Sequence, residues 1–184
     1  DIKVWIEEAK SLKVNPYQHK NLGNNKTIGL FFFNSSLRTR LSTQKAALNL
    51  GMNTMVMNVS GDAWGIEFGD GTVMNGTTAE HIKEAAAVVS QYCDIIAVRA
   101  FPTLTDKVKD ESEYVLKAFI KYATVPVVNM ESATGHPLQG FTDAMTISEY
   151  AQSKKPKVVL SWAPHVKSLP HAVANSFVQA MQKM

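Results

Sequence analysis

Apolar, strand-like runs alternate with helix-like segments along this chain, and that alternation most constrains its fold. The run at residues 26–33 is continuously apolar, which is typical of a strand covered on both faces. We predict further strands at 54–59, 94–98, 125–129 and 157–162. Strands separated by helices form parallel βαβ units. The sequence therefore predicts an α/β fold with a parallel sheet and helices on both faces.

The predicted helices lie between and around these strands. Apolar residues at helical spacing predict the first helix at 2–12. Thr77 and Glu80 have the spacing of a capping box, which predicts a helix at 77–91. The glycine-rich segment 60–76 has no clear period and is expected to be a long surface loop. The other helices are predicted at 38–50, 106–122, 139–152 and 169–181.

The polar segment 153–156, which ends in a proline, is the best candidate for a domain boundary. The chain has 184 residues, of which 45% are hydrophobic, enough for one core or for one domain plus the start of another. We predict a first domain at 1–139, a linking helix and linker at 140–156, and the start of a second domain at 157–184.

Charge and cysteine content narrow the class of protein. The formal net charge is +3, and no dense run of Lys or Arg predicts a nucleic-acid partner. No stretch approaches the roughly 20 apolar residues of a membrane span, so no membrane partner is expected. Cys93 is the only cysteine. It lies in an apolar run, and we expect a buried core thiol in a reducing, cytoplasmic setting.

In parallel sheets, ligands bind beyond the carboxyl ends of the strands. The first strand runs into Ser36, Arg38, Thr39 and Arg40, with Ser36 placed to cap the following helix. Free N–H groups, the helix dipole and two guanidinium groups together suit a phosphate dianion. Without an anion, two cations at a helix N-terminus oppose the dipole. A capped helix with solvated arginines remains the alternative.

Two other strand ends supply further polar groups. Arg99 directly follows the third apolar strand, where it could bind a ligand or form a structural ion pair. Glu131, His136 and Gln139 follow the fourth strand. Because His136 precedes Pro137, it is biased towards an extended conformation and should project from its loop. A structural histidine and a solvated glutamine are the alternatives.

These motifs together carry a family resemblance. The segment from Ser36 to Arg40 resembles the Ser-x-Arg-Thr-Arg signature of the aspartate and ornithine transcarbamoylase family. The segment from His136 to Gln139 is similar to that family's His-Pro-x-Gln, and Arg99 falls between the two. The resemblance covers essentially the whole chain. It implies a carbamoyl-phosphate domain followed by the start of an amino-acid domain.

The resemblance also implies roles for residues. Thr39, Arg99 and His136 would point at the carbonyl oxygen and act catalytically. Negative charge builds on that oxygen and phosphate leaves as an anion, so fixed donors suffice without a metal, a cofactor or a covalent intermediate. The residues that would bind carbamoyl phosphate are Ser36, Leu37, Arg38, Thr39, Trp64, Arg99, His136 and Gln139.

Within the family, the chain resembles the N-acylornithine branch at residues 62–64, 129–131 and 162–165. This implies carbamoyl transfer to an N-acylated ornithine in arginine biosynthesis, by a homotrimer in which Trp64 reaches a neighbour's carbamoyl phosphate. Glu131 and His165 would contact the acceptor. By the same resemblance, acetyl-specific enzymes have a Glu at the position of Ala79. A Glu would repel the carboxylate of a succinyl group, whereas the small Ala79 would leave room for it. We expect N-succinylornithine as the preferred acceptor and N-acetylornithine as the second.

Three alternatives remain open. The chain could belong to an ordinary ornithine or aspartate transcarbamoylase. It could also be a non-catalytic module that binds a phosphate ligand, although its intact set of site residues argues against decay. A nucleotide-binding domain is disfavoured, because no Gly-rich turn follows the first strand and no phosphate-loop lysine is present.

Overall fold

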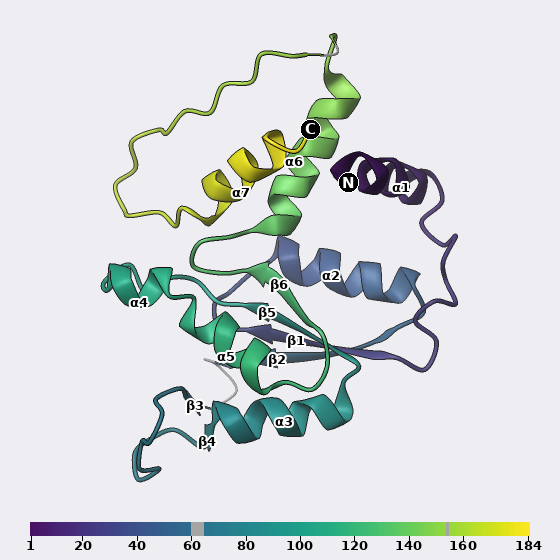
Figure 1. Ribbon diagram of the computed structural model, residues 1–184. Coiled ribbons are helices and arrows are strands. Elements are labelled where there is room, and N and C mark those ends of the chain that lie inside the picture. Colours follow the sequence, from purple (N-terminus) through teal and green to yellow (C-terminus); the bar gives the residue numbers. More distant parts are fainter. Residues whose placement is uncertain (60–64, 154) are drawn as a thin grey trace.

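The computed structural model describes residues 1–59, 65–153 and 155–184. Its centre is a parallel sheet with the strand order β2-β1-β5-β6. A small sheet of β3 and β4 lies apart from it (Figure 1). The strands are β1 (Thr27–Phe32), β2 (Asn53–Asn58), β3 (Ile66–Glu67), β4 (Glu80–His81), β5 (Ile95–Arg99) and β6 (Val127–Glu131). The α/β prediction is confirmed.

Helices cover both faces of the central sheet (Figure 1). α2 (Arg38–Asn49) packs on one face, and α3 (Ile82–Tyr92) and α5 (Tyr114–Tyr122) pack on the other. Successive side chains of a strand point to opposite faces. Leu30 of β1 accordingly lies in the cluster beneath α2, whereas Phe31 meets Phe119 of α5 with ring centroids 5.3 Å apart. Burial on both faces explains why residues 28–32 of this strand have no polar side chain.

The remaining long helices gather beyond the sheet. α1 (Ile2–Val14), α6 (Pro137–Tyr150) and α7 (Ala172–Met181) share a small core. α7 lies against the start of α6 (Figure 1). Within the described ranges, no helix combines the length and apolar character that a membrane span needs. Cys93 is buried in the core beneath α3 and α5, as predicted.

The prediction of a strand at 157–162 is wrong. These residues, all of them described, have an irregular exposed conformation. A strand is stabilised by hydrogen bonds to a neighbouring strand and by a buried face. Residues 157–162 pair with none of the described strands, so β propensity alone does not order them.

Two predicted helices have different boundaries. The helix at 106–122 is divided into α4 (Lys107–Glu111) and α5, because Glu113 adopts a left-handed conformation with φ 56°. The helix predicted at 77–91 begins only at Ile82. Glu80 pairs with Ile66 in the small sheet, which removes it from the predicted capping box. His81 caps α3 instead and accepts a hydrogen bond from the Lys83 amide.

Candidate active site

A cavity of about 500 Å³ opens at the carboxyl edge of the sheet. It brings together groups from the ends of β1, β5 and β6 and from the starts of α2 and α6. Of the residues predicted from the sequence, it is lined by Ser36, Leu37, Arg38, Thr39, Arg99, Glu131, His136 and Gln139. The expectation that ligands bind beyond the carboxyl ends of the strands thus identified side chains that are distant in the sequence but line one cavity.

The start of α2 forms one wall of the cavity. The predicted cap by Ser36 is wrong, because Leu37 is the N-cap residue and makes no side-chain hydrogen bond. The first-turn N–H groups of a helix lack partners within that helix. Within the part of the chain that the structure describes, Arg38 pairs with no carboxylate. Exposed N–H groups beside an uncompensated cation favour an anion at this wall.

Arg40, the second predicted cation, has a different environment. Its guanidinium lies 4.4 Å from the centre of the Phe32 ring and donates to Oδ1 of Asn58. It is not among the described residues that line the cavity. Arg38 alone therefore supplies the guanidinium at the start of α2.

Arg99 is buried and held from several sides. Its Nε donates to Oε2 of Glu131 at 3.2 Å, and its Nη1 donates to the Asn34 and Ser35 carbonyls at 3.2 and 2.8 Å. The guanidinium carbon lies 4.2 Å from the centre of the Phe101 ring. A guanidinium has five N–H groups in a rigid fork. These contacts fix its plane and leave Nη2 with donor capacity towards the cavity.

Glu131 lies between Arg99 and His136. Its Oε2 is 3.1 Å from Nη2 of Arg99 and 3.5 Å from Nε2 of His136. Burial raises the pKa of Glu131, and the positive charge of Arg99 opposes that change. Burial, and secondarily Arg99, lower the pKa of His136. His136 is therefore neutral at pH 7, and its contact with Glu131 is not an ion pair.

Gln139 lies in the first turn of α6, where its Nε2 donates to Oδ1 of Asp143 at 2.9 Å. That bond fixes the amide plane and leaves the side-chain oxygen as an acceptor. His136 precedes α6 in a non-helical conformation, with φ −128° and ψ 71°. Its main-chain N–H donates to Ser176 Oγ of α7 at 2.8 Å. His136 thus precedes the helix, as predicted, and its side chain lines the cavity.

Other predicted site residues are not brought to the cavity. His165 is exposed and hydrogen-bonded to the main chain of Lys167, and Ala79 is exposed with its N–H bonded to the Gly65 carbonyl. Neither belongs to the described lining of the cavity. Trp64, with Asp62 and Ala63, lies outside the described residues.

Two residues that hold Arg99 in place, Asn34 and Phe101, were not predicted from the sequence. Asn34 accepts from Arg99 through its carbonyl, and its Oδ1 accepts from the Phe101 N–H at 2.7 Å. Phe101 in turn packs its ring on Arg99. Both residues follow strand ends, which was an available signal. Their role, however, depends on the pairing of β1 with β5.

Comparison with known proteins decides the family. Residues 1–149 match the carbamoyl-P binding domain of aspartate/ornithine carbamoyltransferases. This chain belongs to that family. The family resemblance inferred from the motifs at Ser36–Arg40 and His136–Gln139 is thus confirmed.

Similar proteins include members of the N-acylornithine branch. The chain is 50% identical to the N-succinylornithine carbamoyltransferase of Bacteroides thetaiotaomicron over 181 residues, which are 98% of this chain and 57% of the relative. It is 46% identical over 162 residues to the N-acetylornithine carbamoyltransferase of Xanthomonas campestris, covering 86% of this chain and 48% of the relative. The chain thus spans about half the length of these curated relatives.

Solved structures agree with these matches. A mutant N-acetyl-L-ornithine transcarbamylase complexed with carbamyl phosphate and N-succinyl-L-norvaline has a TM-score of 0.92 and 42% sequence identity. The match covers 99% of this chain and 55% of the solved chain. The fold described above is therefore that of the N-terminal part of a transcarbamylase.

Proposed function

We propose that this chain is the carbamoyl-phosphate-binding part of an enzyme that carbamoylates the side-chain amine of an N-acylated ornithine. The products are phosphate and an N-acylcitrulline, and the pathway is arginine biosynthesis. The observation that supports this most is the gathering of Arg38, Arg99, His136 and Gln139 around one cavity. A phosphate and a polarised carbonyl need these donors within a few ångströms of one another.

In the proposed complex, the phosphate lies at the start of α2. The N–H groups there and the Arg38 guanidinium compensate its charge as the phosphate leaves. Arg99 and Thr39 face the carbonyl oxygen, on which negative charge grows during attack by the amine. Neutral His136 adds one N–H donor. Preorganised donors of this kind lower the barrier because they need no reorientation during the reaction.

Gln139 is proposed to accept a hydrogen bond from the carbamoyl NH₂. Its amide is already oriented by Asp143, so its oxygen faces the substrate without further ordering. This contact would distinguish a carbamoyl group from an acetyl group on the same phosphate. The reacting amine must be neutral, so activity should fall at low pH.

N-Succinylornithine is the proposed acceptor, with N-acetylornithine second. The N-succinylornithine carbamoyltransferase of Bacteroides thetaiotaomicron, at 50% identity, supports the branch and this order. Glu131, His165 and Ala79 are proposed to face the acceptor, together with residues from the part of the relatives that this chain does not span. The enzyme is proposed to be a cytoplasmic homotrimer. In it, Trp64 of one subunit would reach the carbamoyl phosphate bound by a neighbouring subunit.

The test is an assay of the full-length protein with carbamoyl phosphate and four separate acceptors: N-succinylornithine, N-acetylornithine, ornithine and aspartate. We expect the highest kcat/KM with N-succinylornithine. Product from ornithine or aspartate alone would overturn the acceptor assignment. Binding of carbamoyl phosphate without product from any acceptor would favour the non-catalytic module.

A pair of variants tests the phosphate site separately. Arg38→Gln should weaken binding of carbamoyl phosphate about 10- to 100-fold, because a charge-assisted contact to the phosphate is lost. Lys45→Gln is the matched control. Lys45 belongs to the same helix, and its Nζ bonds the Tyr17 hydroxyl instead. Equal affinities of the two variants would remove Arg38 from the phosphate site.

A further inference from the structure

The junction between α4 and α5 holds a carboxylate in an unusual backbone conformation. Glu113 has φ 56° and ψ 37°, in the left-handed region that glycine and asparagine tolerate best. A glutamate there carries a steric cost. Such a conformation persists only where surrounding contacts stabilise it, so the side chain of Glu113 is expected to make strong contacts.

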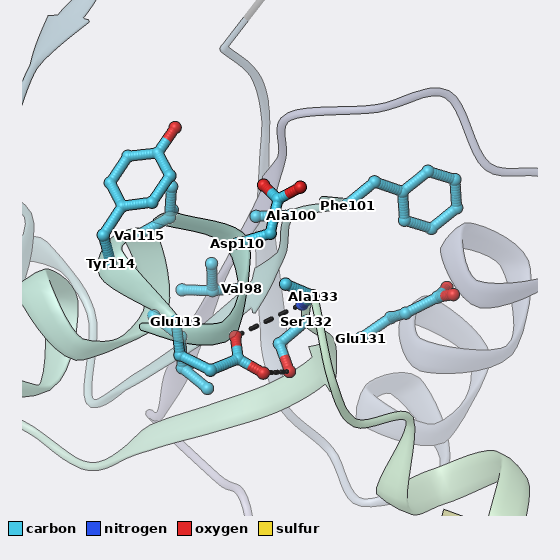
Figure 2. A pocket seen from close by; sticks show the side chains of 11 residues that line it. Val98, Ala100, Phe101, Asp110, Glu113, Tyr114, Val115, Glu131, Ser132 and Ala133 are labelled. Atoms are coloured by element: carbon cyan, nitrogen blue, oxygen red, sulfur yellow. Dashed lines mark hydrogen bonds between the residues drawn. The ribbon is translucent and has the colours of Figure 1, made fainter. Parts of the chain in front are cut away.

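The Glu113 carboxylate binds three successive residues of one loop. Its Oε1 accepts from Ser132 Oγ at 2.7 Å, from the Thr134 N–H at 2.7 Å and from Thr134 Oγ1 at 2.5 Å. Its Oε2 accepts from the Ala133 N–H at 3.2 Å. Figure 2 shows the carboxylate reaching from its helix to Ser132 and Ala133. The contacts fix both the main chain and the side chains of the loop.

Ser132 has the Glu113 carboxylate as its nearest hydrogen-bond acceptor. Its side chain is buried, and its oxygen accepts from Asn129 Nδ2 at 3.0 Å and from the Gly135 N–H at 3.2 Å. A hydroxyl has two lone pairs and one proton. The proton has two acceptors within reach, the Glu113 carboxylate at 2.7 Å and the Gly135 carbonyl at 3.2 Å. Without the carboxylate, the main-chain N–H groups of Ala133 and Thr134 lose their acceptor, and the hydroxyl keeps only the more distant Gly135 carbonyl.

The loop connects two residues of the candidate active site. Glu131 immediately precedes it and His136 immediately follows it, and both line the cavity. Glu113 itself is not part of the cavity's described lining. It lines instead the small hollow drawn in Figure 2, which shares Phe101 and Glu131 with the cavity. The carboxylate of Glu113 bonds to residues 132–134, so its effect on the site passes through the loop.

We propose that Glu113 is a positioning residue that sets where His136 meets the carbamoyl group. The proposal rests on the proposed function for its catalytic consequence. The four bonds to residues 132–134 hold the loop at one end, and the bond from the His136 N–H to Ser176 holds the other. A loop fixed at both ends presents the imidazole in one orientation. Catalysis by fixed donors needs that orientation.

Two variants of the full-length protein test the proposal. Glu113→Gln keeps the size of the side chain but replaces one acceptor oxygen by a donor that faces the loop. Glu113→Gly removes the carboxylate and suits the left-handed backbone. We expect both to lower kcat about 10- to 100-fold, the scale of a small misplacement of a catalytic group. The KM for the acceptor should change much less.

Glu111→Gln is the matched control. Glu111 lies two residues away, where its carboxylate is 3.7 Å from Lys107 Nζ, and among the described residues it makes no hydrogen bond to the loop. The kcat of the Glu111→Gln variant should equal that of the wild type. Hydrogen exchange, followed by mass spectrometry, should accelerate at residues 132–136 in both Glu113 variants and stay unchanged in the control.

The outcomes separate this proposal from the proposed function. A wild-type protein that carbamoylates none of the acceptors would refute the proposed function. The exchange rates at residues 132–136 would still test whether Glu113 holds the loop. Wild-type kcat in a folded Glu113 variant, or unchanged exchange at 132–136, would overturn the proposal. If neither variant folds, the wild type decides: fast exchange at the Ala133 and Thr134 amides would equally overturn it.

Discussion

The guanidinium of Arg99 and the carboxylate of Glu131 form a buried ion pair across the ends of two adjacent strands. Nε and Nη2 lie 3.2 and 3.1 Å from the same oxygen, Oε2, and each side chain is 8% exposed. The two residues are partners in the register of β5 and β6, next to an irregularity between Val98 and Arg99. The protein itself thus fixes the orientation of the Arg99 guanidinium.

Replacing Arg99 by Lys should show that the shape of the guanidinium matters as much as its charge. A single ammonium cannot reach Glu131, the two carbonyls of residues 34 and 35, and the cavity at once. We expect kcat/KM to fall about 100- to 1000-fold, as for loss of a preorganised donor. Steady-state kinetics of the full-length protein measure this. Activity near the wild-type level in a folded variant would contradict it.

Removing the charge of Glu131 should destabilise the fold. Glu131→Gln leaves the buried guanidinium of Arg99 without a counter-charge, at a cost of about 3 kcal/mol in the free energy of unfolding. Urea denaturation measures the difference. Glu149→Gln is the control: it breaks a more exposed ion pair with Lys13, and its cost should stay below about 1 kcal/mol. Equal losses in the two variants would argue against the buried pair.

The sequence predicted the sheet and the convergence of residues at the cavity. Both depend on patterns that do not require knowledge of the tertiary contacts. A continuous apolar strand such as β1 must be covered on both faces, wherever its helices come from. Parallel strands end at one edge, so Arg38, Arg99 and His136 could be placed together without knowing the strand order. Their convergence around the cavity follows from this topology.

The predictions that failed rested on local sequence signals. In the structure, contacts with residues distant in the sequence determine the conformation instead. Thr77 and Glu80 suit a helix start, but pairing of Glu80 with Ile66 places a strand there. Residues 157–162 have strand composition but pair with no strand in the part of the chain that the structure describes. The break at Glu113 has no local signal either, because its carboxylate is bound by residues about 20 positions later in the chain.

The lowered pKa of His136 predicts a loss of stability in weak acid. Its ordinary pKa is 6.5, and burial lowers it in the folded protein. Between these two values the unfolded chain binds a proton that the folded chain does not, so stability falls as pH drops below about 6.5. His136→Gln should remove this part of the slope. Melting temperatures from pH 5 to 7.5 test it, and parallel curves would contradict the assignment.

The close approach of α6 and α7 should make Gly140 intolerant of a side chain. A Cβ at Gly140 would lie 2.4 Å from the main-chain oxygen of Ser176. Gly140→Ala must therefore push α7 away, at a cost of about 1–3 kcal/mol, and loosen the hydrogen bond that the His136 N–H donates to Ser176 Oγ. Gly76→Ala is the control, since a Cβ there meets no atom within 4 Å. A melting temperature of Gly140→Ala equal to that of Gly76→Ala would contradict the packing.

The choice between acyl groups can be tested at Ala79. This residue is exposed, and its main-chain N–H is bonded to the Gly65 carbonyl, so a longer side chain should not disturb the fold. In Ala79→Glu, the new carboxylate would repel the free carboxylate of a succinyl group but not a neutral acetyl group. We expect the ratio of kcat/KM for N-succinylornithine over N-acetylornithine to fall roughly 10-fold, the scale of one screened like-charge contact.

Ala79→Gln separates charge from size in that experiment. The glutamine side chain occupies almost the same volume as glutamate but carries no charge, so its substrate ratio should stay close to that of the wild type. If both variants lower the ratio equally, the effect is steric and the electrostatic argument is wrong. If neither changes it, residue 79 does not face the acyl group. The preference for N-succinylornithine would then depend on other residues of the acceptor site.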